Sequence, residues 1–454
     1  MNRSSEDEPG RKAEAPPKTE ARGVLSKERG ELAIKNEIIG GVTTFLAMAY
    51  IVVVNPSILA TEGTGMAFSG VLTATVALCF TMTLLMGLYA KLPFGVAPGM
   101  GINAYFTFTI ILGQQVPWPV ALGIIFWAGV LFLITSVTPV RVLIAQAIPN
   151  GIRTSMAAGI GVFLTFIGLR NAGMVAFDPV TFVRPGALDQ RALLAIFGVA
   201  VTLWLMNRKS PFAFLGGIGA VTAIAWLTGL VPVPESWFRP PDFESVFFKL
   251  DVVGALQLSL LPAIIGILFT DLFDSISTFI GVSMSAGMLE ENGDPRNLKQ
   301  GLVVDSLATL GAGLFGTSSG TAYIESAAGI NAGARTGLAS VVTAFCFLPC
   351  FFVAPLAGAV PAYATAPVLI LVGAMMFRSV AAIDFTRFED VLPSFLTVVL
   401  IPLTFSITQG ILWGFVAHVG LYLLAGRRRE VKPTMYVLAI MAVGLLVLEH
   451  GRWQ

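Results

Sequence analysis

Long apolar stretches are the feature of this sequence that most limits its possible folds. Fifteen of them recur between residues 38 and 450, and most approach the roughly 20 residues that a helix needs to cross a bilayer. Of the 454 residues, 55% are hydrophobic and 12% are charged, whereas soluble proteins carry about 25% charged residues. A soluble core cannot bury so much apolar surface, so the sequence predicts an all-α polytopic membrane protein.

The candidate spans form two sets on either side of the polar stretch 232–249. The first set is 38–59, 68–90, 97–113, 117–138, 151–170, 191–207 and 213–231. The second set is 256–283, 300–316, 322–336, 337–358, 363–378, 391–406, 408–426 and 433–450. Two of them, 97–113 and 322–336, are too short and glycine-rich for regular spans, and they occupy similar places in the two halves. Such pairs are typical of inverted-repeat transporters and mark the binding site.

Charge predicts how the chain lies in the membrane. Residues 1–35 are polar and lack the apolar region of a signal peptide, so we expect a disordered cytoplasmic tail. Basic residues fall in alternate loops, at Lys91, at Arg141 with Arg153, and at Arg208 with Lys209. Because basic loops stay cytoplasmic, these loops and the N-terminus are expected inside. The side reached by the last stretch, 433–450, stays open.

Several classes of partner are not expected. The net charge is +1 and no long basic run occurs, which argues against nucleic acid. The three cysteines lie in apolar stretches without the spacing of metal ligands, so neither a disulfide framework nor a metal site is predicted.

Two carboxylates stand inside one apolar span, in residues 267–277 (ILFTDLFDSIS). A spacing of three places Asp271 and Asp274 on one face of a helix. Charges at membrane depth usually face a cavity or a partner. Two close carboxylates in a low dielectric repel each other, so at least one is expected to hold a proton near physiological pH, as a proton carrier must. The alternative is a pair at a helix end that bonds only backbone or solvent.

Glu325 and Asn103 follow the two glycine-rich breaks. A helix restarting at Glu325 presents free N–H groups, and the carboxylate can accept hydrogen bonds from the N–H groups of a heterocycle. The alternative is a helix cap without a substrate role. The Asn103 amide can read the edge of a base, or it can satisfy backbone at the break. The backbone near Gly320 and the ring of Tyr323 are further candidates for contact with a planar ligand.

At these residues the chain resembles the nucleobase (xanthine/uracil) permease superfamily, in its adenine/guanine/hypoxanthine branch. Similar stretches are 41–51 (GVTTFLAMAYI), 97–106 (APGMGINAYF), 271–274 (DLFD), 316–329 (GTSSGTAYIESAAG) and 334–338 (ARTGL). The resemblance implies about 14 transmembrane segments, arranged as two inverted seven-segment repeats. Segments 3 and 10 would each be a short strand followed by a half-helix, with the substrate between them.

The resemblance also implies domains and roles. A core domain would comprise 36–138 (segments 1–4) and 251–360 (segments 8–11), and a gate domain 139–250 (segments 5–7) and 361–454 (segments 12–14). A purine base would be bound and imported with a proton, in a multi-pass protein of the plasma membrane that forms a homodimer. The implied substrate and coupling residues are Asn103, Asp271, Asp274 and Glu325, with no cofactor besides the proton. Uracil permeases use a glutamate and a nearby histidine on segment 8, and this chain has Asp271 and no histidine there.

Other functions remain as alternatives. An anion transporter of the same fold, for sulfate or bicarbonate, would favour positive charge in the site, and three carboxylates oppose it. A uracil or xanthine permease is another alternative. A two-aspartate intramembrane protease needs its aspartates on facing helices, whereas Asp271 and Asp274 share one. A passive channel would not concentrate its substrate.

Overall fold

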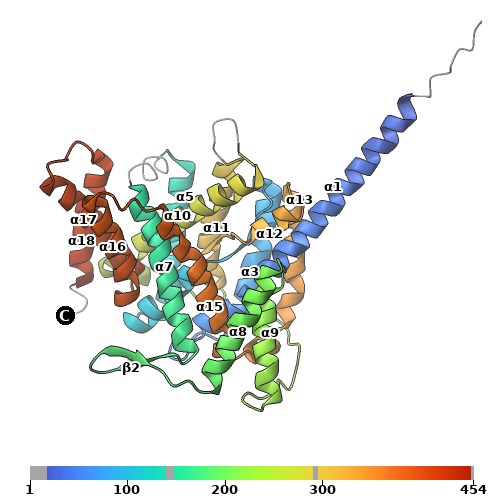
Figure 1. Cartoon of the computed structure of the whole chain (residues 1–454), viewed down its shortest axis with the longest axis horizontal. Coiled ribbons are helices and arrows are strands. Elements are labelled where there is room, and N and C mark those ends of the chain that lie inside the picture. The colour runs from blue at the N-terminus through green and yellow to red at the C-terminus, as the bar shows by residue number, and fades with distance from the viewer. Residues whose placement is uncertain (1–17, 140–147, 290–294, 451–454) are drawn as a thin grey trace, which may run out of the picture.

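The computed structural model describes residues 18–139, 148–289 and 295–450, most of which are helical (Figure 1). The elements of the first half are α1 (Lys18–Met48), α2 (Ile51–Leu59), α3 (Phe68–Leu85), the π-helix η1 (Met86–Ala90), β1 (Val96–Pro98), α4 (Met100–Ala104), the π-helix η2 (Tyr105–Gly113), α5 (Trp118–Val137), α7 (Asn150–Asn171), β2 (Val175–Asp178), β3 (Phe182–Pro185), α8 (Gln190–Asn207) and α9 (Ala213–Leu227).

The second half begins after an irregular segment. Its elements are η3 (Gly254–Leu256), η4 (Leu258–Leu260), α10 (Leu261–Ala286), α11 (Leu298–Phe315), β4 (Gly320–Ala322), α12 (Ser326–Asn331), α13 (Gly337–Phe347), η5 (Leu348–Phe352), α14 (Ala354–Gly358), α15 (Ala362–Phe377), η6 (Arg378–Ala382), α16 (Phe388–Thr404), α17 (Ile407–Leu424) and α18 (Pro433–His450).

The described residues contain eight helical segments that are long and apolar enough to cross a membrane. Four shorter apolar helices, Met100–Gly113, Ala213–Leu227, Gly337–Phe352 and Pro433–Glu449, accompany them. A polytopic helical membrane protein is therefore confirmed. The arrangement as 14 segments in two inverted repeats stays a prediction.

The first helix differs from the sequence prediction. Residues 1–35 were expected to form a disordered tail, but α1 begins at Lys18 and runs without a break to Met48; residues 1–17 lie outside the described part. The residues from Lys18 onward are rich in Glu, Lys, Ala, Arg and Leu, which favour helix, and no proline occurs between Pro17 and Pro56. In Figure 1 this helix extends well beyond the rest of the molecule.

The two glycine-rich breaks meet as a short antiparallel pair of strands. Val96 pairs with Ala322, Ala97 with Thr321 and Pro98 with Gly320. Each strand leads into a helix, β1 into α4 and β4 into α12. The strand-and-helix breaks expected for segments 3 and 10 are present, because proline and small residues discourage helix and let the two backbones approach.

The helices pack in two groups. In one, α1 contacts α12 and α13, α3 contacts α11 and α13, and α5 contacts α11. In the other, α7 contacts α15 and α16, and α8 contacts α9 and α15. The paired strands belong to the first group, where β1 lies against α3 and β4 against α10 and α11.

The two ends of the molecule carry different connections (Figure 1). The start of α1 and the α17–α18 connection lie at the upper end in that view, and the β2–β3 hairpin lies at the lower end. The last helix, α18, packs beside α17 and returns the chain to the lower end. The stretch 433–450, whose side the sequence left open, thus ends on the side of the β2–β3 hairpin.

Candidate functional site

A cavity of about 130 Å³ lies beside the paired strands. Its walls come from the α1–α2 break, the β1–α4 junction, α10, the β4–α12 junction and α15. The lining residues are Tyr50, Gly99, Met100, Gly101, Asp274, Thr278, 321–325, Val372 and Met376. Both helix groups contribute to this wall, since Val372 and Met376 belong to α15.

Glu325 is fixed by a contact from a distant part of the chain. It precedes α12, but its side chain makes no capping hydrogen bond to that helix. Instead, Tyr50 donates its hydroxyl hydrogen to Oε1 of Glu325 at 2.6 Å. Tyr50 is fully buried and sits where α1 ends and α2 has not begun. The helix-cap alternative therefore does not describe this carboxylate, which lines the cavity and is held by Tyr50.

Asp274 lines the same cavity from α10. It is half-buried, and among the described residues no group donates a hydrogen bond to its carboxylate. The alternative of a carboxylate bonded only at a helix end does not fit, because Asp274 lies in the middle of the 26-residue helix α10. It is thus a carboxylate without a fixed partner, next to Tyr323 and Glu325 in the cavity wall.

Asp271 points elsewhere. It is fully buried, and its Oδ2 accepts hydrogen bonds from the hydroxyls of Ser319 at 2.5 Å and Thr309 at 2.9 Å. It is not among the residues that line the cavity. Asp271 thus joins α10 to α11 and to the segment before β4, and its expected roles in substrate binding and proton coupling stay predictions.

Asn103 is also set back from the cavity. It is buried in α4, and its Oδ1 accepts a hydrogen bond from the hydroxyl of Ser318, which precedes β4. Its Nδ2 is buried and has no hydrogen-bond partner among the described residues. The Asn103 amide thus bonds a side chain of the second break and not its backbone, and its expected role in reading a base edge stays a prediction.

Tyr323 and Gly320 have different positions. The Tyr323 ring lines the cavity, and its hydroxyl donates to the carbonyl oxygen of Pro98 at 2.5 Å. Gly320 faces away from the cavity, because a Cβ there would lie 2.9 Å from the Cβ of Ala308 on α11. Tyr323 is therefore placed to contact a ligand, and Gly320 permits β4 to approach α11.

Asp305 belongs to this cluster and was not singled out from the sequence. It is fully buried in α11, and its Oδ2 accepts a hydrogen bond from the backbone N–H of Ala322 at 3.1 Å. The signal was available, since Asp305 is a charge inside the apolar stretch 300–316, where charges are rare and usually functional. Two carboxylates therefore hold this segment in place. Asp271 bonds the side chain of Ser319, just before β4, and Asp305 bonds the backbone of Ala322, within β4.

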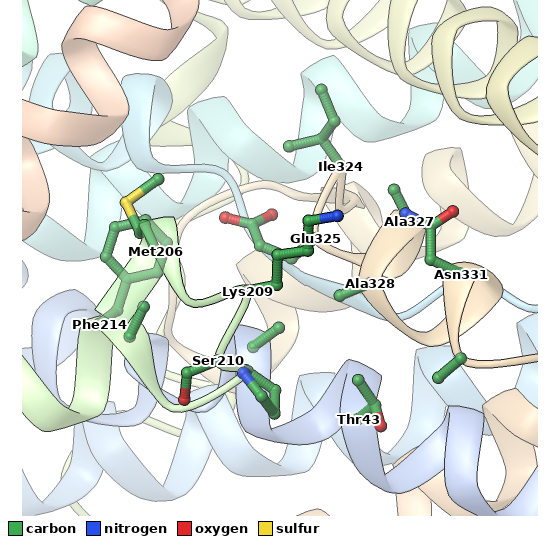
Figure 2. A pocket seen from close by; sticks show the side chains of 14 residues that line it. Thr43, Met206, Lys209, Ser210, Phe214, Ile324, Glu325, Ala327, Ala328 and Asn331 are labelled. Atoms are coloured by element: carbon green, nitrogen blue, oxygen red, sulfur yellow. The ribbon is translucent and has the colours of Figure 1, made fainter. Parts of the chain in front are cut away.

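A wider hollow of about 850 Å³ adjoins the cavity and shares Ile324 and Glu325 with it. Figure 2 shows the side chains of Glu325, Lys209 and Phe214 extending into this hollow from different elements. Lys209 and Phe214 come from the α8–α9 turn and α9, and Thr43 comes from α1. The hollow is wide enough to give a ligand access to Glu325.

No metal centre is evident in the part of the chain that the structure describes. There, no three His, Cys, Asp or Glu side chains gather so that they could hold an ion.

Comparison with known sequences relates most of the chain to permeases. Residues 35–412 match the Permease family (Xan_ur_permease). The putative permease MJ0326 of Methanocaldococcus jannaschii is 44% identical over 410 residues, covering 90% of this chain and 94% of that protein. The adenine permease AdeP of Escherichia coli is 38% identical, covering 94% and 96%. The guanine/hypoxanthine permease PbuG of Bacillus subtilis is 39% identical, covering 90% and 95%.

Comparison with solved structures supports the fold. The transmembrane domain of the cyanobacterial bicarbonate transporter BicA superposes with a TM-score of 0.63 at 18% identity, covering 85% of this chain and 97% of that one. The structure of SLC26A9 gives a TM-score of 0.60 at 10% identity, covering 90% and 67%. At these identities the likeness concerns the transporter fold alone.

Proposed function

This chain belongs to the Permease family, and we propose that it is a proton-coupled symporter that imports purine nucleobases across the plasma membrane. The substrate class rests on the relatives, which include permeases for adenine and for guanine and hypoxanthine. Adenine, guanine and hypoxanthine share a planar bicyclic ring whose edge carries N–H groups. The site must therefore offer a flat surface and hydrogen-bond acceptors.

The observation that carries the proposal is the shared cavity of Glu325, Tyr323 and Asp274. Glu325 accepts hydrogen bonds from ring or exocyclic N–H groups, and the hydroxyl of Tyr50 holds its carboxylate in place. The Tyr323 ring offers a face for stacking. Asn103, Asp271 and Gly320 do not touch the base in this proposal. They position the two strands that form the cavity wall.

The coupling proton is carried by carboxylates in and beside the cavity. Asp274 and Glu325 line the cavity, while Asp271 and Asp305 are buried against β4 and the residues before it; we treat the four carboxylates as one coupled titration. A proton taken up with the neutral purine lowers the charge of the site. Because moving charge through a low-dielectric barrier is costly, neutralisation favours movement of the loaded site.

The movement is proposed to occur between two domains. The core domain (36–138 and 251–360) carries the strands and most of the cavity, and the gate domain (139–250 and 361–454) carries α7–α9 and α15–α18. The 850 Å³ hollow lies between α1 and α12 of the core domain and the α8–α9 turn of the gate domain. With Lys209 in a basic, cytoplasmic loop, this is the exit to the cytoplasm. A homodimer would anchor the gate domain while the core domain moves.

Two alternatives have specific support. The solved structures of similar fold include a bicarbonate transporter, but four carboxylates beside the strands repel an anion. A uracil or xanthine permease fits the family as a whole, whereas the relatives at 36–39% identity include several purine permeases.

The test is uptake of radiolabelled adenine, guanine, hypoxanthine and uracil in cells that lack their own permeases. The wild type, Glu325→Gln, Asp274→Asn and Asp271→Asn are compared with and without a protonophore. Purine uptake that falls with the protonophore and in Glu325→Gln supports the proposal. Uptake of uracil alone would move the protein to another branch of the family, and uptake of no base by well-expressed protein would overturn the nucleobase assignment.

A further inference from the structure

A second, smaller cavity of about 30 Å³ touches Asp274 on another side. It shares Asp274 and Met376 with the proposed purine cavity. Its other polar side chains are Arg153 of α7 and Thr270 and Ser277 of α10. A space needs roughly 10–15 Å³ to hold one water molecule, together with two or more polar partners. This cavity meets both conditions, so a water can bridge Asp274 and Arg153.

Arg153 stands between this cavity and a larger polar pocket. It is half-buried, and its Nη2 donates to Oδ1 of Asn150 at 3.3 Å. Its Nε is buried without a hydrogen-bond partner, and no ion pair links it to a carboxylate in the described part of the chain. Arg153 also lines a pocket of about 340 Å³. Arg153 is thus a cation in the first turn of α7 that forms no ion pair with an acid among the described residues.

The larger pocket opens beside the α17–α18 connection. Asp390 lies in its wall, where it accepts the hydroxyl hydrogen of Tyr422 at 2.9 Å and lies 3.9 Å from Nδ1 of His418. Glu430, also in the wall, forms ion pairs with Arg387 at 3.2 Å and Arg427 at 3.6 Å. The purine cavity and the 30 Å³ cavity share Asp274, and the 30 Å³ cavity and this pocket share Arg153, so a series of three cavities leads from the purine cavity toward Asp390 and His418.

We propose that Arg153 drives release of the coupling proton from Asp274 along this series of cavities, apart from the hollow through which the purine leaves. The inference rests on the proposed proton symport. A guanidinium does not give up its own proton, so Arg153 acts through its charge, which stabilises the Asp274 carboxylate once the O–H bond breaks. The bridging water accepts that proton and passes it toward Asp390 and His418.

The sizes of the cavities indicate separate exits for the purine and for the proton. The purine needs the 850 Å³ hollow beside Glu325, whereas the 30 Å³ cavity admits only water. The ionisable groups that line the two cavities with Asp274 are one acid, two phenols and one cation, namely Glu325 of the β4–α12 junction, Tyr50, Tyr323 and Arg153. The acids Asp271 and Asp305 lie behind them. Arg153 is the cation of this set, and it is the group that can favour the charged form of Asp274.

The experiment uses full-length purified protein in liposomes and separates two activities. Purine exchange, with base on both sides, needs no net proton release, while net uptake driven by an imposed pH gradient does. For Arg153→Gln we expect exchange within about twofold of wild type and net uptake lower by about tenfold, the effect of one unit of proton affinity. Raising the internal pH by about one unit should restore net uptake, and Arg153→Lys should retain most of it.

The matched control is Arg208→Gln, which removes a cation that stacks on Trp204 and lines none of these cavities; it should alter neither activity. Equal loss of exchange and net uptake in Arg153→Gln, no loss of either, or net uptake that internal pH does not restore would overturn the inference. A wild type that exchanges purines but shows no uptake driven by the pH gradient would instead overturn the proposed proton symport.

Discussion

The hydroxyl of Tyr50 lies 2.6 Å from Oε1 of Glu325, although 275 positions separate the two residues in the sequence. This hydrogen bond joins the end of α1 in the first half to the start of α12 in the second. It spans one edge of the cavity, so the two halves of the chain jointly set the orientation of the carboxylate that we propose to bind the purine.

Removal of that donor should weaken purine binding. Tyr50→Phe keeps the buried ring but frees the Glu325 carboxylate, and a hydrogen bond to a charged group contributes about 1.5–3 kcal/mol. We expect the KM for purine uptake to rise by about tenfold, with the maximal rate less affected. Tyr363→Phe is the control, since the buried hydroxyl of Tyr363 has no hydrogen-bond partner in the part of the chain that the structure describes. An unchanged KM in Tyr50→Phe would contradict the role given to this contact.

Asp305 should matter for stability. In Asp305→Ala the buried N–H of Ala322 loses its acceptor, which costs about 1–3 kcal/mol. Asp305→Asn keeps an acceptor oxygen and should lose less. Thermal unfolding of the purified proteins in detergent measures this. The midpoint should be highest for the wild type, lower for Asp305→Asn and lowest for Asp305→Ala. Equal midpoints for all three would show that Asp305 does not hold β4 in place.

A substitution of Gly320 tests the close approach of β4 to α11. A Cβ there would lie 2.9 Å from the Cβ of Ala308 and 3.0 Å from Cδ2 of Leu78, so Gly320→Ala must displace the strand. Overpacking of this kind costs about 1–3 kcal/mol, and we expect a lower unfolding midpoint together with reduced uptake. Gly219→Ala in α9 is the control, because open space surrounds that position. A fully active and stable Gly320→Ala would refute the packing argument.

Asp242 should make stability depend on pH in a predictable direction. It lies in the loop before α10, where burial raises its pKa, but hydrogen bonds from the hydroxyls of Ser245 and Ser69 and from two backbone N–H groups outweigh burial and leave the pKa below its usual value. A lowered pKa gives stability that is present above the unfolded value of about 3.9 and is lost as pH falls through the folded value.

The corresponding variant is Asp242→Asn. At pH 7 it should unfold at a lower temperature than the wild type, by the equivalent of about 1 kcal/mol, and the difference should shrink below pH ~4. Unfolding midpoints at several pH values measure this. A difference that is the same at pH 7 and at pH 3 would mean that the charge of Asp242 is not involved.

The sequence was sufficient for the class of fold and for the position of the two paired breaks, because both depend on local patterns. Apolar length predicted the helices, and the residue types at 97–113 and 322–336 predicted the breaks that pair as β1 and β4. Glu325 was identified for the same local reason. Its partner Tyr50 was not, since nothing in the residues around Tyr50 indicates which distant segment it meets.

Helical spacing alone did not predict that Asp271 and Asp274 have different surroundings. Residues three apart lie 60° from each other around a helix of 3.6 residues per turn, and that angle is enough to direct one carboxylate to Ser319 and Thr309 and the other to the cavities. Which of them faces the ligand depends on the neighbours of α10, which only the tertiary structure supplies.

The most direct test of proton-coupled purine transport is to record the pH outside liposomes that contain the purified protein, with no gradient imposed, while a purine is added. Adenine, guanine or hypoxanthine should make the outside medium more alkaline, because protons enter with the base. Glu325→Gln should abolish this change, and Tyr363→Phe should preserve it. Purine entry by the wild type without any change in external pH would contradict proton-coupled transport.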